Sequence, residues 1–396
     1  MEKKLSKLKK LHDYFSVTSI PNNFSEIIKE ELEINLEGKY GPYFLKNPIL
    51  IAPGQLTVNT NQISRIKDAG YAGCILKSVV GEDKKGNCSM GCQRRKATYT
   101  QTVYDTDDRK GSFPIIHWDG RGDTRTLSEY LLFAREAIKY SDVGVGFIRP
   151  AGLINQAPTS IDVNLFNAFV LVASTLCHLP SPREEIKEEE WLFTAKNLFS
   201  LGYNLLEIDF CPSLKKEDGL IVEKENILRW YKTVPSLIKS ASPRIMVYPK
   251  LLNLDWGLDF QIRMVAAAQE GKSDGIIVAN RIFKEEYNSA HGGKELRERN
   301  LRMVKEIKKT FPDIPISATG GIYSGRHVFD YLNAGAENVQ LLSYIMGKVN
   351  TPFARKTGNK LEKVFHNLML DPEDGLISCM LQLCHPERRR RVSSFG

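Results

Sequence analysis

The stretch RIMVYPKLLNLDWGLDFQIRMVAAAQEGKSDGIIVAN, which covers residues 244–280, contains the repeating unit of the predicted fold. Its two ends, residues 244–251 and 274–280, are nearly continuous apolar runs, as is typical of strands that are buried on both faces. The residues between them predict a helix over 258–269. A strand, a helix and a strand in this order indicate a parallel βαβ unit.

The same alternation continues in both directions along the chain. Together with the two strands above, the further apolar runs make eight predicted strands, at residues 47–53, 72–79, 168–176, 204–210, 314–319 and 338–345. A helix is predicted after every strand, at residues 61–69, 127–140, 188–200, 224–240, 258–269, 294–311, 325–333 and 352–368. Eight such units predict closure into a (β/α)₈ TIM barrel, and a doubly wound open sheet with extra strands is the alternative.

The chain is longer than a barrel requires. It has 396 residues, whereas a (β/α)₈ barrel needs about 250. We expect an N-terminal helical extension over residues 1–44, a barrel over 45–368 with an insert after the second strand at about 80–125, and a C-terminal tail over 369–396. In the extension, leucines alternate with lysines over residues 2–15 at helical spacing, which favours a docking helix over a membrane-surface anchor.

Composition excludes several classes of protein. Apolar residues make up 42% of the chain and charged residues 26%, both close to the averages of soluble globular proteins, so wholesale disorder is excluded. The seven cysteines in a long chain do not suggest a disulfide framework, and we expect a cytoplasmic protein. The sequence contains no run of 18 apolar residues, so no transmembrane helix is predicted. The formal net charge of +8 is compatible with an anionic ligand.

Two lysines end predicted strands, Lys77 after the second and Lys250 after the fifth. The carboxyl ends of barrel strands meet at the active-site face, so both side chains are expected there. An unpaired buried charge is costly. The pair therefore indicates a bound anion or an electron-rich ring, unless each lysine pairs with a nearby carboxylate.

Small residues follow the late strands. Gly292-Gly293 and Gly320-Gly321 allow backbone N–H groups to approach an anion closely, and Ser343 ends the last predicted strand. Phosphate sites on these loops are frequent in barrels, so a phosphorylated ligand or cofactor is predicted. Cys211 directly follows the fourth strand and is either a proton-transferring base or nucleophile, or an inert buried thiol.

Strand by strand, the chain resembles the flavin-dependent dihydroorotate dehydrogenase family, which includes the pyrimidine-ring domain of dihydropyrimidine dehydrogenase. The similarity covers roughly residues 45–79 and 168–350. The motifs that carry it are Leu45-Lys46-Asn47-Pro48 with Ala52-Pro53-Gly54, Ala69-Gly70-Tyr71-Ala72-Gly73 with Lys77-Ser78, Cys211-Pro212-Ser213, Lys250, Asn280, Thr319-Gly320-Gly321-Ile322, and Gly335-Ala336 with Gln340.

The resemblance implies FMN as the cofactor and an oxidoreductase that acts on a CH–CH or C=C bond. The residues implied to bind FMN are Ala52, Gly54, Lys77, Ser78, Lys250, Asn280, Gly292, Gly293, Gly320, Gly321 and Ser343. Cys211 and Lys250 are implied as catalytic residues, with Cys211 as the base that removes a substrate proton while hydride passes to flavin N5. Asp209, Ser213 and Arg281 are expected to contact the substrate.

Several positions differ from the family pattern. Ser213 replaces the asparagine after Cys-Pro, and Leu342 replaces the glycine before the last serine. Glu207 and Asp209 precede the cysteine, and a pocket lined by both would repel a carboxylate unless Arg94, Arg95 or Arg281 compensates. The substrate loop of the family is replaced by a basic insert.

The four cysteines Cys88, Cys92, Cys379 and Cys384 could bind zinc or an iron–sulfur cluster if the insert and the tail meet. Neither spacing is the usual C-x₂-C, so free thiols are favoured and no metal is predicted. The run Arg388–Arg391 is interpreted as part of a solvated tail.

These observations predict an FMN-dependent enzyme of pyrimidine metabolism with a small-molecule substrate. We further expect a soluble electron acceptor or a partner protein, and a homodimer is a possible assembly. Two alternatives are a flavin-free barrel that binds or isomerises a phosphorylated metabolite, and a flavin-dependent RNA-modifying enzyme suggested by the basic segments.

Overall fold

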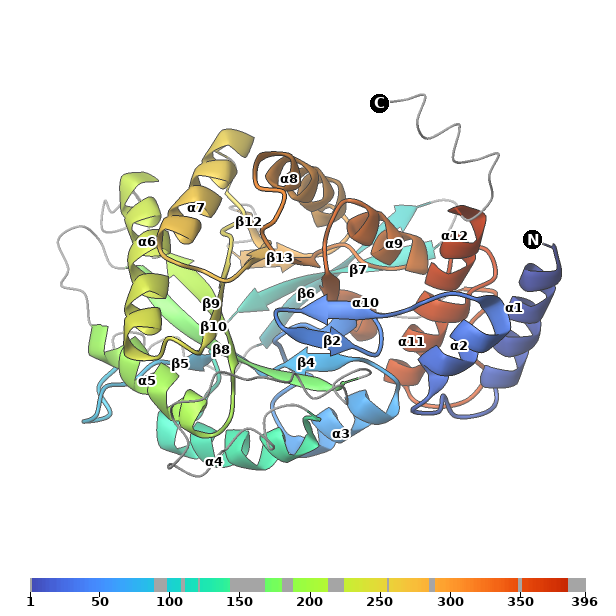
Figure 1. The fold of residues 1–396 in the computed structure, drawn as a ribbon, viewed down its shortest axis with the longest axis horizontal. Helices are drawn as coiled ribbons and strands as arrows, with labels where there is room; N and C mark the ends of the chain where they lie inside the picture. Colours follow the sequence, from blue (N-terminus) through green and yellow to red (C-terminus); the bar gives the residue numbers. More distant parts are fainter. Residues whose placement is uncertain are drawn as a thin grey trace, which may run out of the picture.

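A computed structural model gives the fold of the chain and describes residues 2–88, 98–107, 111–119, 122–142, 168–179, 188–212, 224–254, 256–284, 289–347 and 351–383. A closed barrel of eight parallel strands lies at the centre (Figure 1). Its strands, in order around the barrel, are β3 (Ile49–Ile51), β4 (Gly73–Ile75), β8 (Val170–Leu179), β9 (Leu205–Pro212), β10 (Met246–Lys250), β11 (Ile276–Val278), β14 (Ile316–Thr319) and β15 (Asn338–Leu341). The predicted TIM barrel is confirmed.

The barrel closes through two parallel pairings. β4 pairs with β8 with Gly73 opposite Val170, and β15 pairs with β3 with Val339 opposite Ile49. Gly73 is needed at this seam because a Cβ there would lie 2.3 Å from the carbonyl oxygen of Val170. The short strand β5 (Val79–Val80) extends the pairing along β8.

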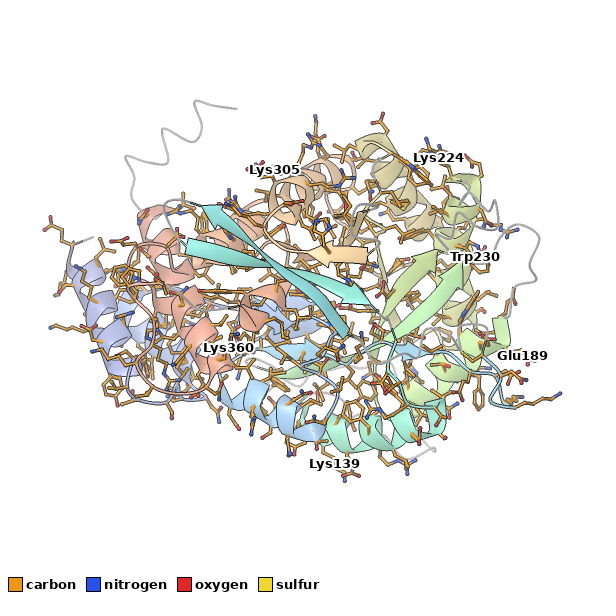
Figure 2. The ribbon with its side chains drawn as sticks, turned by 180° about the vertical axis from the view of Figure 1, so that it is seen from behind. Lys139, Glu189, Lys224, Trp230, Lys305 and Lys360 are labelled. Carbon is orange, nitrogen blue, oxygen red and sulfur yellow. The ribbon has the colours of Figure 1, made fainter. Side chains whose placement is uncertain are left out.

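A layer of helices covers the strands. In chain order it comprises α3 (Thr60–Asp68), α4 (Leu127–Ala137) with the 3₁₀ turn η2 (Ile138–Tyr140), α5 (Glu188–Ser200), α6 (Lys224–Ala241), α7 (Leu258–Glu270), α8 (Leu296–Thr310), α9 (Gly325–Asn333) and α11 (Lys360–Leu370). Neighbouring helices of this layer also pack on one another, as with the buried rings of Trp191 in α5 and Trp230 in α6, whose centroids lie 5.1 Å apart. Figure 2 shows charged side chains such as Lys139 and Glu189 on the outer side of this layer.

A hairpin from the N-terminal extension closes one end of the barrel. It consists of β1 (Gly38–Tyr40) and β2 (Tyr43–Leu45). Tyr40 is fully buried and its ring lies 5.0 Å from that of Tyr248 in β10. The hairpin bonds to the amino ends of the strands, since Lys39 accepts a hydrogen bond from Asn338 at the start of β15. The opposite, carboxyl end of the barrel therefore remains for a site.

The rest of the extension packs beside the C-terminal helices. α1 (Glu2–Phe15) and α2 (Phe24–Leu32) lie next to α11 and α12 (Leu376–Leu383) in Figure 1. Leu8 and Phe15 of α1 are buried, and the ring of Phe15 lies 5.6 Å from that of Phe24. The predicted docking helix is therefore confirmed for α1. None of the helices in the described ranges combines the length and the apolar character that a membrane crossing needs.

Three expected elements differ from the structure. The last predicted helix begins at Lys360 and not at Pro352, because a capping box of Asn359 and Glu362 starts it. The segment expected as a tail contains α12, whose apolar sequence LISCMLQL is largely buried. The last strand ends at Leu341, and the short helix α10 (Ser343–Met346) follows.

The insert contains two strands where a polar stretch was expected, β6 (Thr98–Asp107) and β7 (Gly111–Asp119). They form a four-stranded antiparallel sheet with β12 (Ile282–Lys284) and β13 (Ser289–Gly292), which follow the barrel strand β11. The pairing places Gly292 of β13 opposite Ile116 of β7. The insert is thereby joined to one of the glycine loops predicted to bind a phosphate.

Candidate active site

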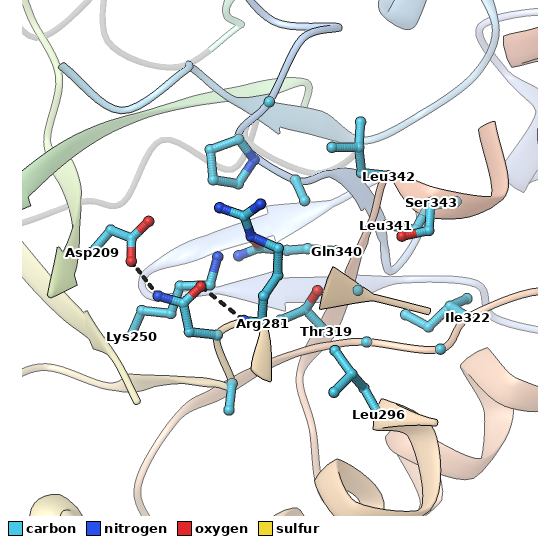
Figure 3. A pocket seen from close by; sticks show the side chains of 18 of the residues that line it. Asp209, Lys250, Arg281, Leu296, Thr319, Ile322, Gln340, Leu341, Leu342 and Ser343 are labelled. Carbon is cyan, nitrogen blue, oxygen red and sulfur yellow. Dashed lines mark hydrogen bonds between the residues drawn. The ribbon is translucent and has the colours of Figure 1, made fainter. Parts of the chain in front are cut away.

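A cavity opens at the carboxyl end of the barrel strands, with about 870 Å³ of empty space when its open mouth is included (Figure 3). Its walls come from the ends of β3, β4, β9, β10, β11, β14 and β15 and from the loop that precedes α8. The lining residues are Ala52, Pro53, Gly54, Lys77, Ser78, Asp209, Lys250, Ala279, Asn280, Arg281, Gly292, Gly293, Leu296, Thr319, Gly320, Gly321, Ile322, Gln340, Leu341, Leu342 and Ser343. Every residue predicted to bind the cofactor therefore lies on this one cavity.

One part of the cavity lining consists of the backbone of four glycines together with Ser343, and we call it the glycine wall (Gly292, Gly293, Gly320, Gly321 and Ser343). Gly320 and Gly321 have φ angles of +105° and +66°, in the left-handed region that favours glycine. A Cβ on Gly321 would lie 2.5 Å from the Cβ of Arg297. This wall therefore requires glycine for its conformation and for the space behind it.

Buried polar side chains hold the glycine wall from behind. Asn300 in α8 donates a hydrogen bond from Nδ2 to the carbonyl oxygen of Thr319 at 2.7 Å. The hydroxyl group of Tyr331 in α9 donates to the carbonyl oxygen of Gly320 at 2.8 Å. Both carbonyl groups are engaged on the helix side, so the loop that follows β14 is held in place.

A departure from the family pattern has a steric explanation. Leu342 stands where the family usually has glycine, and its side chain packs against Gly54 after β3. A Cβ on Gly54 would lie 2.4 Å from the Cδ2 of Leu342. The two residues are therefore complementary in size: Gly54 supplies the space that Leu342 occupies.

A second part of the lining carries four charged side chains and the amide of Asn280, and we call it the charged wall (Lys77, Asp209, Lys250, Asn280 and Arg281). It adjoins the glycine wall, since a Cβ on Gly292 would lie 3.7 Å from Cγ of Arg281. Lys77 and Lys250 are 9% and 8% exposed, and within the described ranges neither ammonium group forms an ion pair. Burial lowers the pKa of Lys77 to about 8, and the charge of Arg281 acts in the same direction. Two poorly solvated cations without carboxylate partners favour an anionic or electron-rich ligand.

The two lysines are positioned in the same way. Tyr130 in α4 donates a hydrogen bond to the carbonyl oxygen of Lys77 at 2.9 Å. Tyr231 in α6 donates to the carbonyl oxygen of Lys250 at 2.7 Å and accepts one from the backbone N–H of Leu252 at 2.8 Å. A buried tyrosine from the helix layer thus fixes the backbone at each lysine. No sequence motif predicted this role for either tyrosine.

Asp209, Asn280 and Arg281 form a chain of hydrogen bonds across the charged wall (Figure 3). Asn280 donates from Nδ2 to the carboxylate of Asp209 at 2.5 Å, and its Oδ1 accepts from the backbone N–H of Arg281 at 2.9 Å. Asn253 donates to the carbonyl oxygen of Asn280 at 3.1 Å. Among the described residues, the lining thus carries the cations of Lys77, Lys250 and Arg281 and one carboxylate, that of Asp209.

Glu207 does not line the cavity, and the expectation that it does is wrong. Its side chain is 1% exposed and lies beneath the cavity, inside the barrel. It accepts a hydrogen bond from Gln340, which does line the cavity. In a strand, side chains two residues apart share a face. Asp209 pairs with Lys250 at the carboxyl end of β10, whereas Glu207 pairs with Tyr248 and so lies deeper in the barrel.

Some predicted residues fall outside the described part of the chain. Cys211 is the second-last residue of β9, with its backbone opposite His178 of β8, but its side chain lies outside that part. Ser213, Arg94 and Arg95 also lie outside the described residues. Their roles stay predictions.

The cysteines considered for a metal site are only partly described. Cys379 is buried in α12 and Cys88 is partly exposed, while Cys92 and Cys384 lie outside the described residues. Burial raises the pKa of the Cys379 thiol to about 11, so it is protonated near neutral pH. Within the described ranges, no group of three or more histidine, cysteine or acidic side chains is arranged to hold a metal ion.

Comparison with known proteins agrees with this geometry. The family model "Dihydroorotate dehydrogenase" matches residues 248–365, which include the ends of β10, β11, β14 and β15. The chain is 29% identical over 134 residues to "Dihydroorotate dehydrogenase (quinone)" of Dichelobacter nodosus, covering 31% of this chain and 36% of that protein. It is 27% identical over 165 residues to "Dihydroorotate dehydrogenase B (NAD(+)), catalytic subunit" of Staphylococcus carnosus, covering 38% of this chain and 52% of that protein.

A solved structure extends the likeness in fold to most of the chain. It is a crystal structure of dihydroorotate dehydrogenase from Eimeria tenella in complex with ferulenol, with a TM-score of 0.56 and 12% sequence identity, covering 86% of this chain and 88% of that one. The matched segments span between a third and somewhat more than half of the curated relatives named above. The resemblance predicted from the sequence is confirmed: this chain resembles the dihydroorotate dehydrogenase family, with the family match centred on the late strands of its barrel.

Proposed function

We propose that the protein is an FMN-dependent oxidoreductase of the dihydroorotate dehydrogenase type that acts on a CH–CH or C=C bond. The observation that carries the proposal is the meeting of the glycine wall and the charged wall in one cavity. A flavin mononucleotide has a phosphate at one end and an electron-accepting ring at the other. The cavity offers a surface suited to each.

The residues present fit FMN. Gly320 and Gly321, with their left-handed backbone, place no side chain on the cavity, so their backbone groups are open to a phosphate. The ammonium groups of Lys77 and Lys250, which form no ion pair within the described ranges, suit the ring, which becomes negatively charged on reduction. We assign the phosphate to Gly292, Gly293, Gly320, Gly321 and Ser343, and the ring and ribityl chain to Ala52, Gly54, Lys77, Ser78, Lys250 and Asn280.

When bound, FMN supplies a hydride acceptor at N5. In the proposed reaction, the Cys211 thiolate takes a proton from one substrate carbon, and the electron pair of that C–H bond forms the new C=C bond. The neighbouring carbon loses hydride, so two electrons and one proton leave with it and the second proton stays on Sγ. Lys250 and Lys77 hold the negative charge that develops in the cavity.

Substrate contacts are assigned to Asp209, Ser213 and Arg281. Arg281 presents the flexible cation of the charged wall, and a guanidinium group matches a carboxylate in shape and charge. Asp209, held by Asn280, offers an acceptor to an N–H group of the substrate. A carboxylate next to an N–H on a ring is the pattern expected of a dihydropyrimidine acid such as dihydroorotate.

We propose a soluble acceptor or a partner protein for reoxidation, and a homodimer as the assembly. One curated relative is named for quinone and another as the catalytic subunit of an NAD(+) enzyme, so the resemblance itself is compatible with either acceptor.

Cys211→Ser tests the proposed reaction. We expect the rate of flavin reduction by dihydroorotate to fall by about 10²–10⁴-fold because a proton-transferring base is lost, while FMN remains bound. Anaerobic stopped-flow absorbance of the FMN-loaded protein measures this rate. Cys379→Ser is the matched control, since that thiol is buried in α12, and it should leave the rate unchanged. An unaltered rate in Cys211→Ser would remove Cys211 from the base role.

A further inference from the structure

A buried polar network lies directly beneath the cavity. Glu207 of β9 is at its centre, and its Oε1 accepts hydrogen bonds from the hydroxyl group of Tyr40 and from Nε2 of Gln340, both at 2.6 Å. Tyr40 belongs to the hairpin that closes the amino end of the barrel, and Gln340 lines the cavity at the carboxyl end. One carboxyl group therefore links the closed end of the barrel to the floor of the site.

The orientation of Gln340 follows from a chain of donors. Asn338 donates from Nδ2 to the carbonyl oxygen of Lys39, so its Oδ1 faces Ser317 as an acceptor. Ser317 donates to that oxygen at 2.6 Å and consequently accepts from Nε2 of Gln340 at 2.9 Å. Both hydrogens of the Gln340 amide are thus used, one toward Ser317 and one toward Glu207.

Two buried oxygen atoms of the Glu207 and Gln340 side chains have no hydrogen-bond partner among the described residues. They are Oε2 of Glu207 and Oε1 of Gln340. If Glu207 is ionised, its Oε2 carries negative charge without a hydrogen-bond donor, and the loss of hydration costs free energy. If Glu207 is protonated, the hydrogen can sit on Oε2. The network therefore has room for one proton and holds it on an oxygen that no other donor uses.

The charges around Glu207 come from several elements. Lys250 of β10 favours the carboxylate, and Asp209, further along β9, favours the protonated form. The hydroxyl groups of Tyr40 and Tyr248 are the other titratable groups near it, and burial raises the pKa of Tyr40 well above its usual value. Burial raises the pKa of Glu207 to about 7, so both protonation states are accessible near neutral pH.

We propose that Glu207 is a redox-linked proton site: it takes up one proton from solvent when the cofactor in the cavity receives two electrons, and releases it on reoxidation. The inference rests on the proposed function. Transfer of a hydride adds one negative charge to a poorly solvated cavity whose floor, Gln340, is bonded to Glu207. At an effective dielectric constant of about 20, a unit charge at about 10 Å changes a proton-binding constant by about tenfold.

Glu207 does not contact the reacting atoms. It is a positioning residue that acts on the cavity through its hydrogen bond to Gln340 and through its charge. Its role is to offset part of the negative charge that reduction adds to the cavity. Near neutral pH the reduction equilibrium of bound FMN should then depend on pH through up to about half a proton more than the cofactor itself binds.

The test is the reduction potential of bound FMN as a function of pH, measured by spectroelectrochemical titration of the FMN-loaded protein. Each proton taken up with two electrons changes the reduction equilibrium tenfold per pH unit, which corresponds to about 30 mV. A tenfold tighter proton binding raises the pKa of Glu207 by about one unit from about 7, so the extra uptake is confined to about pH 7–8 and reaches about half a proton. In that range we expect the slope of the wild-type protein to be steeper than that of Glu207→Gln by about 15 mV per pH unit.

Two further variants sharpen the measurement. Tyr40→Phe removes a donor to Oε1 and should move the steep region to higher pH, and it provides a second reading if Glu207→Gln folds poorly. Glu337→Gln is the matched control, because Glu337 is a half-buried carboxylate that pairs with Lys39 at the other end of the barrel. It should leave the slope at its wild-type value.

Infrared difference spectra between oxidised and reduced protein give an independent reading. The wild-type protein should gain the band of a protonated carboxyl group on reduction, and Glu207→Gln should lack it. Equal slopes in wild type and Glu207→Gln, with no such band, would overturn the inference while leaving the proposed function intact. A protein that takes up no FMN would overturn the proposed function first.

Discussion

The glycine wall and the charged wall line one cavity but are built on different principles. The glycine wall offers backbone, and its shape depends on left-handed φ angles and on hydrogen bonds from Asn300 and Tyr331 behind it. The charged wall offers side chains whose charge depends on burial and on one another. Binding at the first is a matter of conformation, and binding at the second is a matter of electrostatics.

This difference implies that the two walls respond to different perturbations. A side chain added to the glycine wall should act at every pH, because it changes sterics. A change in the charged wall should act within a limited pH range, because it changes a titration. Substitutions in each wall, followed as FMN affinity against pH, separate the two contributions.

Gly321→Val should have the largest effect on binding. The residue has a φ of +66°, and its Cβ would lie 2.5 Å from Arg297, so the loop must move away from its position on the cavity. We expect the FMN dissociation constant to rise by about 100-fold, the equivalent of about 2.7 kcal/mol, at all pH values. Fluorescence titration of the apoprotein with FMN measures it.

Gly257→Ala is the matched control for that substitution. Gly257 also has a positive φ, +86°, but a Cβ there would meet no atom within 4 Å and the residue does not line the cavity. It should cost backbone strain of about 1–2 kcal/mol in stability and leave FMN affinity unchanged. A similar loss of affinity in both variants would show that the glycine wall has no special role.

Lys77→Met should have a smaller effect that depends on pH. The pKa of Lys77 in the free protein is lowered to about 8 by burial and by Arg281, and an anionic ligand raises it again. Affinity of the wild type should therefore fall as pH rises above 8, by up to tenfold per pH unit. Lys77→Met should bind FMN about tenfold more weakly at pH 7 and lack this fall. Isothermal titration between pH 6.5 and 9.5 tests both points.

His366 should affect stability and not binding. It is fully buried in α11, with Nε2 bonded to the carbonyl oxygen of His12 in α1 at 3.0 Å. Burial lowers the pKa of His366 to about 4 from 6.5. His366 binds a proton more readily in the unfolded chain than in the folded one. Its contribution to the free energy of unfolding is therefore fully present above pH 6.5. Between pH 6.5 and 4 it should fall by about 1.4 kcal/mol per pH unit.

Urea denaturation of wild type and His366→Gln between pH 4.5 and 8 measures this slope. The variant should lose the part of the pH dependence of the free energy of unfolding that His366 causes. It should keep the FMN affinity of the wild type. If His366→Gln altered the pH dependence of FMN affinity, the assignment of that dependence to Lys77 would be wrong.

The sequence was sufficient to predict which strand-end residues lie at the site. It was insufficient to predict which residues support them from behind. Lys77, Lys250 and Gly320 could be placed on one site because parallel strands of a closed barrel end at the same face. Tyr130, which holds Lys77 through a backbone carbonyl, could not be found, since any buried tyrosine in an amphipathic helix has the same pattern.

Pairings between distant segments also escaped prediction. The strands β6 and β7 occur in a polar insert, and β13, which pairs with β7, lies about 170 residues further along the chain. No local pattern in the sequence therefore reveals this sheet. Glu207 was visible as an acidic residue within an apolar strand, but its depth depends on Tyr40 and Gln340, which come from opposite ends of the chain.

The most direct test of the central claim is the visible absorption spectrum of the purified protein, with the FMN released on denaturation quantified against protein. We expect a yellow protein with about one FMN per chain, or apoprotein that regains this ratio when FMN is added. We also expect that Gly321→Val loses the colour while Gly257→Ala retains it. A colourless, folded wild-type protein that takes up no FMN would contradict the account and favour a barrel that binds a phosphorylated metabolite without a flavin.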